Sequence, residues 1–100
     1  MPEIRLFDAH NHLHNYPGEK ETAEALARAS TAGVRLMLCN GTRPDDWAKV
    51  LELSHRAGIV PFFGLHPWFV DKAPTGWLEL LEDLLRRAPS GVGEIGLDKA

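Results

Sequence analysis

The chain has 100 residues, of which 44% are hydrophobic and 25% charged, and its formal net charge is −3. This composition is typical of a globular domain and excludes disordered and collagen-like classes. Proteins that hold nucleic acid through bulk electrostatics carry clustered Lys and Arg, so the negative charge argues against that mode of binding. Any phosphate chemistry in this protein would therefore depend on bound cations.

The sequence also bears on the cellular compartment. It contains no apolar run near the roughly 20 residues that a membrane span needs, and its N-terminus lacks the pattern of a signal peptide. The single cysteine, Cys39, cannot form an intramolecular disulfide and is expected to be a small core residue. We predict a cytoplasmic protein without a membrane partner.

Apolar runs of β type alternate with helical patterns along the whole chain. In chain order the pattern predicts a strand over 4–7, a helix over 19–31, a strand over 34–39, a helix over 44–57, a strand over 59–65, a helix over 75–88 and a strand over 92–97. The strands start about 30 residues apart, which is the size of one βαβ unit. The alternation predicts an α/β fold with a parallel sheet.

The predicted helices carry recognisable boundaries and buried faces. Gly33 is expected to end the first helix in a left-handed conformation, and the capping-box spacing from Thr42 to Asp45, with Pro44 at the first turn, begins the second. The expected buried positions are Ala25, Leu26 and Ala29 in the first helix, Trp47, Val50, Leu51 and Ser54 in the second, and Trp77, Leu80, Leu81, Leu84 and Leu85 in the third. Each helix would thus cover one face of the sheet.

Four parallel strands do not close a β/α barrel, which needs eight strands and typically about 250 residues. We therefore interpret residues 1–100 as the first half of a TIM-like β/α barrel and as the N-terminal portion of one larger domain. An open half would leave sheet edges and apolar surface uncovered. Its expected partner is the remaining barrel half, or a second copy if the polypeptide is complete.

The motif Asp8-Ala9-His10-Asn11-His12-Leu13-His14 follows the first predicted strand. In an extended backbone alternate side chains point the same way, so Asp8, His10, His12 and His14 are expected to converge on one point. Neutral imidazoles bind Zn²⁺ and similar ions, and a carboxylate can orient a ring through its other nitrogen. A metal site is the preferred interpretation, the alternative is a polar loop, and His14 is the weakest member.

Two further motifs occupy the ends of later strands. Gly64-Leu65-His66-Pro67-Trp68 places His66 at the strand end where barrel enzymes carry their chemistry, although a lone histidine could also be an ordinary loop residue. Gly93-Glu94-Ile95-Gly96-Leu97-Asp98 places Glu94 in an otherwise apolar run, where a metal ion would partner a buried carboxylate and water would solvate an exposed one. Asp98 could contact substrate, support a ligand or cap the loop.

The motifs DAHNHLH, GLHPW and GEIGLD, in this order, resemble the TatD family of metal-dependent deoxyribonucleases. The resemblance implies that His10 and His12 bind one metal ion, that Glu94 bridges two ions, and that His66 lies near the substrate phosphate. It also implies further histidines and an aspartate from later strands. Residues 1–100 alone are therefore expected to lack nuclease activity.

The activity implied by this resemblance is cleavage of DNA or another phosphodiester by metal-activated water, with Glu94 and His66 as catalytic residues. One or two divalent ions are expected, and Zn, Mg and Mn all suit imidazole and carboxylate ligands. Two alternatives remain. One is a hydrolase of the wider amidohydrolase-type superfamily that acts on an amide, a lactone or a small phosphoester. The other is a barrel fragment without catalytic activity.

Overall fold

The computed structural model describes residues 4–99. Its elements follow in the order β1 (Leu6–Asn11), the 3-10 helix η1 (Leu13–Asn15), α1 (Glu19–Ala32), β2 (Val34–Asn40), α2 (Pro44–Leu53), β3 (Ile59–Phe63), the 3-10 helix η2 (Pro67–Lys72), α3 (Trp77–Arg87) and β4 (Gly91–Val92). The predicted alternation of strands and helices is confirmed.

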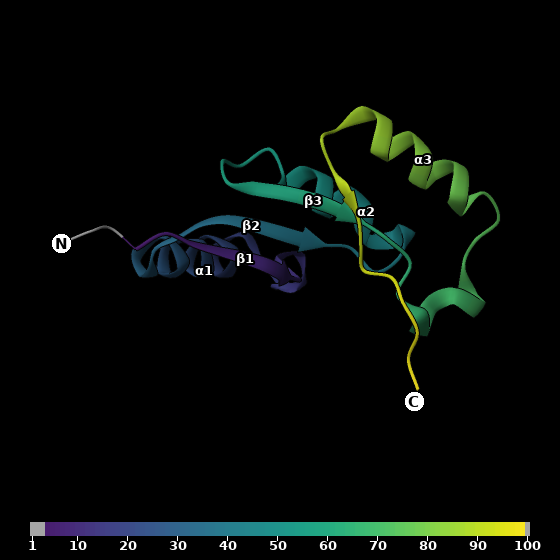
Figure 1. The fold of residues 1–100 in the computed structure, drawn as a ribbon, viewed down its shortest axis with the longest axis horizontal. Helices are drawn as coiled ribbons and strands as arrows, with labels where there is room; N and C mark the ends of the chain where they lie inside the picture. Colours follow the sequence, from purple (N-terminus) through teal and green to yellow (C-terminus); the bar gives the residue numbers. More distant parts are fainter. Residues whose placement is uncertain (1–3, 100) are drawn as a thin grey trace.

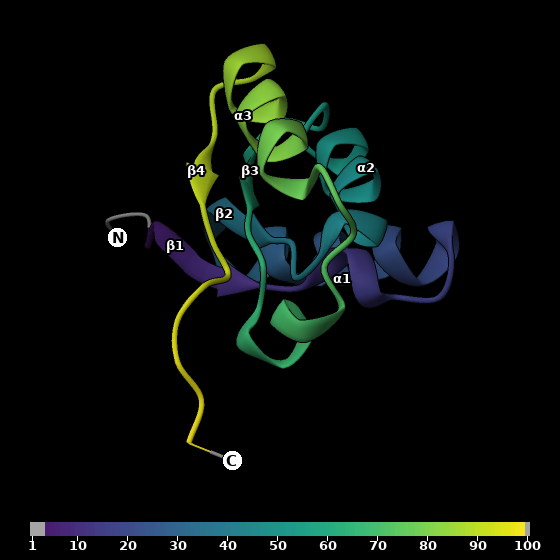
Figure 2. The same cartoon turned by 90° about the vertical axis from the view of Figure 1, so that its right-hand side faces the viewer.

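The four strands form one sheet in the order β1-β2-β3-β4, and all three neighbouring pairs are parallel. Helices α1, α2 and α3 lie together on one side of this sheet (Figures 1 and 2). Right-handed crossovers between successive parallel strands place the helices this way. The chain is an α/β half-barrel, as predicted, and among residues 4–99 the strands β1 and β4 each pair on one side only.

The first strand is longer than predicted, because β1 extends through Asn11 instead of ending at Phe7. Its pairing with β2 is irregular: Asp8 lies opposite Met37 and Asn11 opposite Cys39, so β1 uses three residues where β2 uses two. Such a bulge reverses the alternation of side chains. The residues on either side of the bulge therefore do not share a face as simple alternation predicts.

The predicted strand over 92–97 is largely wrong, since β4 comprises only Gly91 and Val92. Beyond it, the N–H of Gly93 bonds to Phe63 O at 3.0 Å, but the N–H of Glu94 bonds to Gly41 O at the end of β2. The chain leaves the β3 ladder at this point. The apolar residues that follow are exposed, and Leu97 is completely so.

The core lies between the sheet and helices α2 and α3. Its fully buried side chains are Trp47, Val50, Cys39 and Phe63, and the residues from α3 are Leu81 and Leu84. The predicted burial of Cys39 is confirmed, but Leu80 is 41% exposed, contrary to the prediction. Trp47 also donates its Nε1–H to Gly64 O at 2.9 Å, which fixes α2 to the end of β3.

The helix boundaries agree with their sequence signals at most ends. Gly33 ends α1 with φ of 101°, and Pro44 begins α2. Helix α2 ends at Leu53, four residues before the predicted Ala57. The reason is that the backbone N–H groups of His55 and Arg56 bond to the carbonyl three residues earlier, as in a 3-10 turn, and not to the one four residues earlier. None of the helices within residues 4–99 has the length and apolar character required to cross a membrane.

Candidate metal centre

Three side chains meet at the carboxyl end of the sheet. His10 and His12 come from the end of β1, and Glu94 from the segment after β4. Glu94 Oε1 lies 3.2 Å from His10 Nε2 and 3.0 Å from His12 Nε2, and the two imidazole nitrogens are 3.3 Å apart. One ligand atom from each residue therefore falls within 4.8 Å of the other two. The structure brings together the three residues predicted to bind metal.

The tautomer of the neutral His12 ring is set by a neighbour on β2. Its Nδ1 lies 2.8 Å from the backbone oxygen of Asn40, which can only accept, so Nδ1 carries the proton. In the neutral ring Nε2 then has a lone pair, and this lone pair faces the carboxylate oxygen of Glu94. Two acceptors at this distance require a cation or proton between them, and a divalent ion fits this set of nitrogen and oxygen donors.

His66 also contacts Glu94, but it does so with a protonated Nε2, whereas the Nε2 of His12 is unprotonated. Its Nδ1 accepts the backbone N–H of Trp68 at 3.1 Å, so the neutral ring carries its proton on Nε2. That nitrogen lies 3.2 Å from Glu94 Oε2 and donates to it. His66 thus presents an N–H group to the site, which suits a hydrogen bond to a carboxylate or a phosphate oxygen.

Two glycines permit the backbones around Glu94 to approach closely. A Cβ atom at Gly64 would lie 2.5 Å from the carbonyl carbon of Gly93, and one at Gly93 would lie 2.4 Å from Asn40 Oδ1. The peptide bond between Gly93 and Glu94 is cis.

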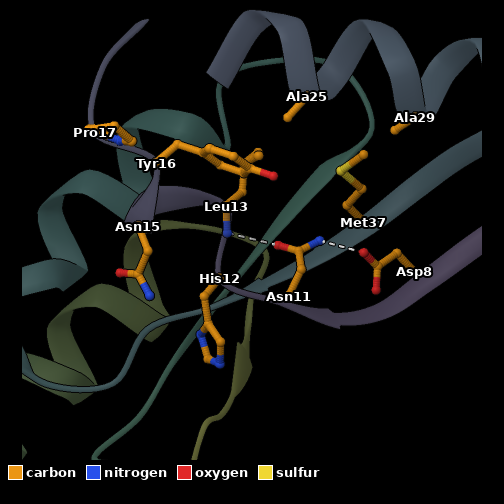
Figure 3. A pocket seen from close by; sticks show the side chains of 10 residues that line it. All are labelled: Asp8, Asn11, His12, Leu13, Asn15, Tyr16, Pro17, Ala25, Ala29 and Met37. Atoms are coloured by element: carbon orange, nitrogen blue, oxygen red, sulfur yellow. Dashed lines mark hydrogen bonds between the residues drawn. The ribbon is translucent and has the colours of Figure 1, made fainter. Parts of the chain in front are cut away.

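Asp8 does not point into this site, contrary to the prediction of four converging side chains. Its oxygens accept the backbone N–H of His10 at 3.1 Å and the Asn11 side-chain amide at 2.9 Å. Asp8 and Asn11 line a cavity of about 490 Å³ beside α1. In Figure 3 the ring of His12 points away from both of them. The physical reason is the bulge in β1, which turns His10 and His12 to the other side.

His14 also lies outside the cluster, as the weakest of the four predictions. Its side chain is buried, with Nε2 at 3.0 Å from Asp46 Oδ2 and Nδ1 at 3.6 Å from Cys39 Sγ. Burial lowers the pKa of His14, but the hydrogen bonds to Asp46 and Cys39 outweigh it and raise the pKa to about 9. Burial raises the pKa of Asp46, yet its bonds to His14 and Thr42 bring that pKa below its usual range. The two residues form a buried ion pair.

The sequence did not reveal the contributions of β2 and of the loop after it. Asn40 O bonds to the ring of His12, Gly41 O to the N–H of Glu94, and Thr42 O to the N–H of His66. These contacts use backbone oxygens, so no pattern of side chains in the sequence predicts them. The available signal was the polar Asn40-Gly41-Thr42 run at a strand end. Asp98, for which three roles were open, accepts a hydrogen bond from Trp68 Nε1.

A parallel half-barrel with two histidines and a glutamate at the carboxyl ends of its strands has the architecture of a β/α-barrel protein, with its polar cluster at the face where such barrels carry their active sites. Comparison with known families narrows the class. Residues 7–100 match the family model described as TatD related DNase. The chain therefore belongs to the TatD-related DNase family.

Known proteins and structures agree with this membership. The chain is 35% identical to YjjV of Escherichia coli K12, named an uncharacterized metal-dependent hydrolase, over 94% of this chain and 38% of that protein. It is 32% identical to tatdn3-B of Xenopus laevis, provisionally named a deoxyribonuclease, over 95% of this chain and 42% of that protein. The crystal structure of YjjV, a TatD homologue, superposes with a TM-score of 0.84 at 34% identity, over 96% of this chain and 39% of that one. The chain spans about two fifths of the length of these relatives.

Proposed function

We propose that this chain carries part of the active site of a metal-dependent hydrolase that cleaves phosphodiester bonds as a TatD-like deoxyribonuclease. The observation that supports it most directly is the meeting of three potential ligand atoms, from His10, His12 and Glu94, within 4.8 Å of one another. Two imidazole nitrogens and a carboxylate oxygen form a ligand set that suits a divalent cation. The family match supports hydrolysis as the reaction class and is consistent with DNA as the substrate.

In this proposal His10 and His12 hold the ion through Nε2, and the Asn40 carbonyl keeps the His12 ring in the required tautomer. Glu94 would bind the ion through Oε1, which faces these rings, while its Oε2 accepts the Nε2–H of His66. A divalent ion held by these residues would lower the pKa of its bound water and neutralise charge on phosphate oxygens. When substrate binds, His66 would turn its Nε2–H from Glu94 Oε2 to a phosphate oxygen.

The surface beside the site favours a nucleic acid substrate over a small amide or lactone. Trp68 is 67% exposed, and its ring centroid lies 5.0 Å from that of His66. Nucleobases of single strands stack on exposed aromatic side chains, and each stacked base contributes about 1–3 kcal/mol. The hydrogen bond from Trp68 to Asp98 fixes the indole in place. We infer that Trp68 holds a base next to the scissile phosphate.

The experiment is a substrate panel assayed on the intact natural protein that contains residues 1–100. Single-stranded DNA, a chromogenic phosphodiester and a cyclic amide are each tested with added Zn²⁺, Mg²⁺ or Mn²⁺, and Glu94→Gln is the control variant. We expect metal-dependent cleavage of DNA that Glu94→Gln abolishes. Hydrolysis of the amide without DNA cleavage would favour an amidohydrolase-type enzyme. A metal-loaded protein that hydrolyses none of the substrates would favour a barrel without catalytic activity.

A further inference from the structure

We propose that Asp46 is a positioning residue, which fixes the backbone of residues 40–42 and through it the groups of the candidate metal centre. The inference rests on the proposed metal site but concerns a residue of α2 that contacts none of the site's own side chains. It assigns a role to a carboxylate that the family resemblance left without one.

The backbone of residues 40–42 is hydrogen-bonded to each of the three segments that carry the side chains of the site. Three consecutive carbonyl oxygens accept one hydrogen bond apiece: Asn40 O from His12 Nδ1 at 2.8 Å, Gly41 O from Glu94 N at 2.9 Å, and Thr42 O from His66 N at 2.7 Å. These bonds reach β1, the segment after β4 and the segment after β3. A rotation of this short backbone would therefore displace the histidine ring, the carboxylate and the phosphate-facing imidazole together.

Asp46 is the side chain that anchors this backbone. Both of its oxygens lie 3.0 Å from Thr42 N, its Oδ2 accepts the hydroxyl of Thr42 at 2.6 Å, and its Oδ1 lies 3.4 Å from Arg43 N. Bonds to a charged acceptor are stronger than neutral ones, and the side chain is only 17% exposed, so water competes weakly. His14 closes the network from η1, because its Nε2 lies 3.0 Å from Asp46 Oδ2.

The network does more than begin a helix. Asp45 occupies the same first turn of α2, where either carboxylate would interact favourably with the helix dipole. Asp45 is exposed, and no hydrogen bond or ion pair of its side chain is seen within residues 4–99. Both aspartates thus interact with the helix dipole, but only Asp46 forms hydrogen bonds to the loop before α2. Asp45→Asn is therefore a matched control for Asp46→Asn.

The first measurement is hydrogen exchange of backbone amides in the metal-free form of the intact natural protein that contains residues 1–100. The amides of Glu94 and His66 report the bonds to Gly41 O and Thr42 O directly. We expect Asp46→Asn to speed their exchange at least about 10-fold while the amides within α1 stay as in the parent. Asp45→Asn should leave all of these rates within twofold. Uniform acceleration over the whole chain would mean global destabilisation and would overturn a positioning role.

The second measurement is the dissociation constant for Zn²⁺ by competition with a chelating dye. Removing outer-shell partners typically weakens metal binding about 10–100-fold, and we expect Asp46→Asn to fall in that range. If Asp46→Asn does not fold, Thr42→Val takes its place, since it removes only the hydroxyl contact and is expected to give a smaller loss of about 2–5-fold.

The outcomes separate this inference from the proposed function. If the parent chain binds no Zn²⁺, the metal proposal fails, while faster exchange of the two amides in Asp46→Asn still supports the positioning role. Unchanged exchange at Glu94 and His66 overturns the positioning role whatever the parent binds. If Asp46→Asn and Asp45→Asn weaken Zn²⁺ binding alike, the loss of one negative charge explains the effect, and the positioning role is overturned as well.

Discussion

Gly64→Ala is expected to disable the candidate metal centre by moving Glu94. Gly64 is buried directly after β3, and an added Cβ would lie 2.5 Å from the carbonyl carbon of Gly93 and 2.6 Å from Glu94 O. Ordinary contact begins at 3.4 Å, so the two backbones must separate by about 0.9 Å. Neither side of this contact is a flexible side chain that could move away. The displacement is therefore transmitted to the carboxylate of Glu94.

A shift of this size exceeds what a metal site tolerates. Ligand distances in such sites hold to about 0.2 Å, so we expect Gly64→Ala to weaken Zn²⁺ binding at least about 10-fold. Misplacement by about 1 Å can cost about 100-fold in rate, and overpacking costs about 1–3 kcal/mol of unfolding free energy. Zn²⁺ competition titrations and urea unfolding of the chain measure the first and last of these effects.

The control is Gly18→Ala, at the start of α1. Gly18 has φ of −157°, which any residue adopts, and its added Cβ would meet only the flexible end of Glu21. We expect a loss of less than about 1 kcal/mol and unchanged Zn²⁺ affinity. The reasoning is refuted if Gly64→Ala binds Zn²⁺ as tightly as the parent, or if Gly18→Ala loses affinity to the same degree.

Three further predictions concern the carboxylate, the core and the ion pair. In the intact natural protein, Glu94→Gln should lower kcat/KM for DNA at least about 100-fold while circular dichroism shows the native fold, and near-native turnover would remove Glu94 from the site. Trp47→Phe leaves the buried Gly64 carbonyl without its donor and should cost about 1–3 kcal/mol in urea unfolding, whereas a loss below about 0.5 would contradict this. Because the pKa of His14 is raised to about 9 from 6.5, its pairing with Asp46 stabilises the fold fully below pH 6.5 and less as the pH rises through 9. The Tm should fall over that range, and His14→Gln should flatten the fall; an equal fall in both proteins would assign it to other groups.

Much of this fold could be predicted because its elements follow local rules. Helix α3 has its apolar residues at helical spacing, and α1 ends at a glycine that adopts the left-handed conformation. The wrong boundaries occur where tertiary contacts override those rules. The bulge in β1 depends on pairing with β2 and has no signal within residues 6–11. Asp8 was placed on the wrong side for that reason.

The side chains of the site could also be predicted, since His10, His12, His66 and Glu94 all lie at or just after the ends of strands that meet at one edge. The groups that orient them could not. Asn40, Gly41 and Thr42 act through backbone carbonyls, and a carbonyl is present at every residue of every chain. Only the folded arrangement selects which carbonyls matter. Asp46 was overlooked in the same way, because its partners are a buried histidine and a loop brought together by α2 and η1.

The early end of β4 also explains how a site can assemble in an open sheet. In the order β1-β2-β3-β4 the strands that supply His10 and Glu94 lie at opposite edges, yet their side chains are 3.2 Å apart. The chain after β4 bonds first to Phe63 on β3 and then, one residue later, to Gly41 beyond β2. This crossing carries Glu94 over β3 to the neighbour of β1. A regular strand through residue 97 would have kept Glu94 in the β3 ladder, so the departure from the predicted strand and the meeting of the ligands have one cause.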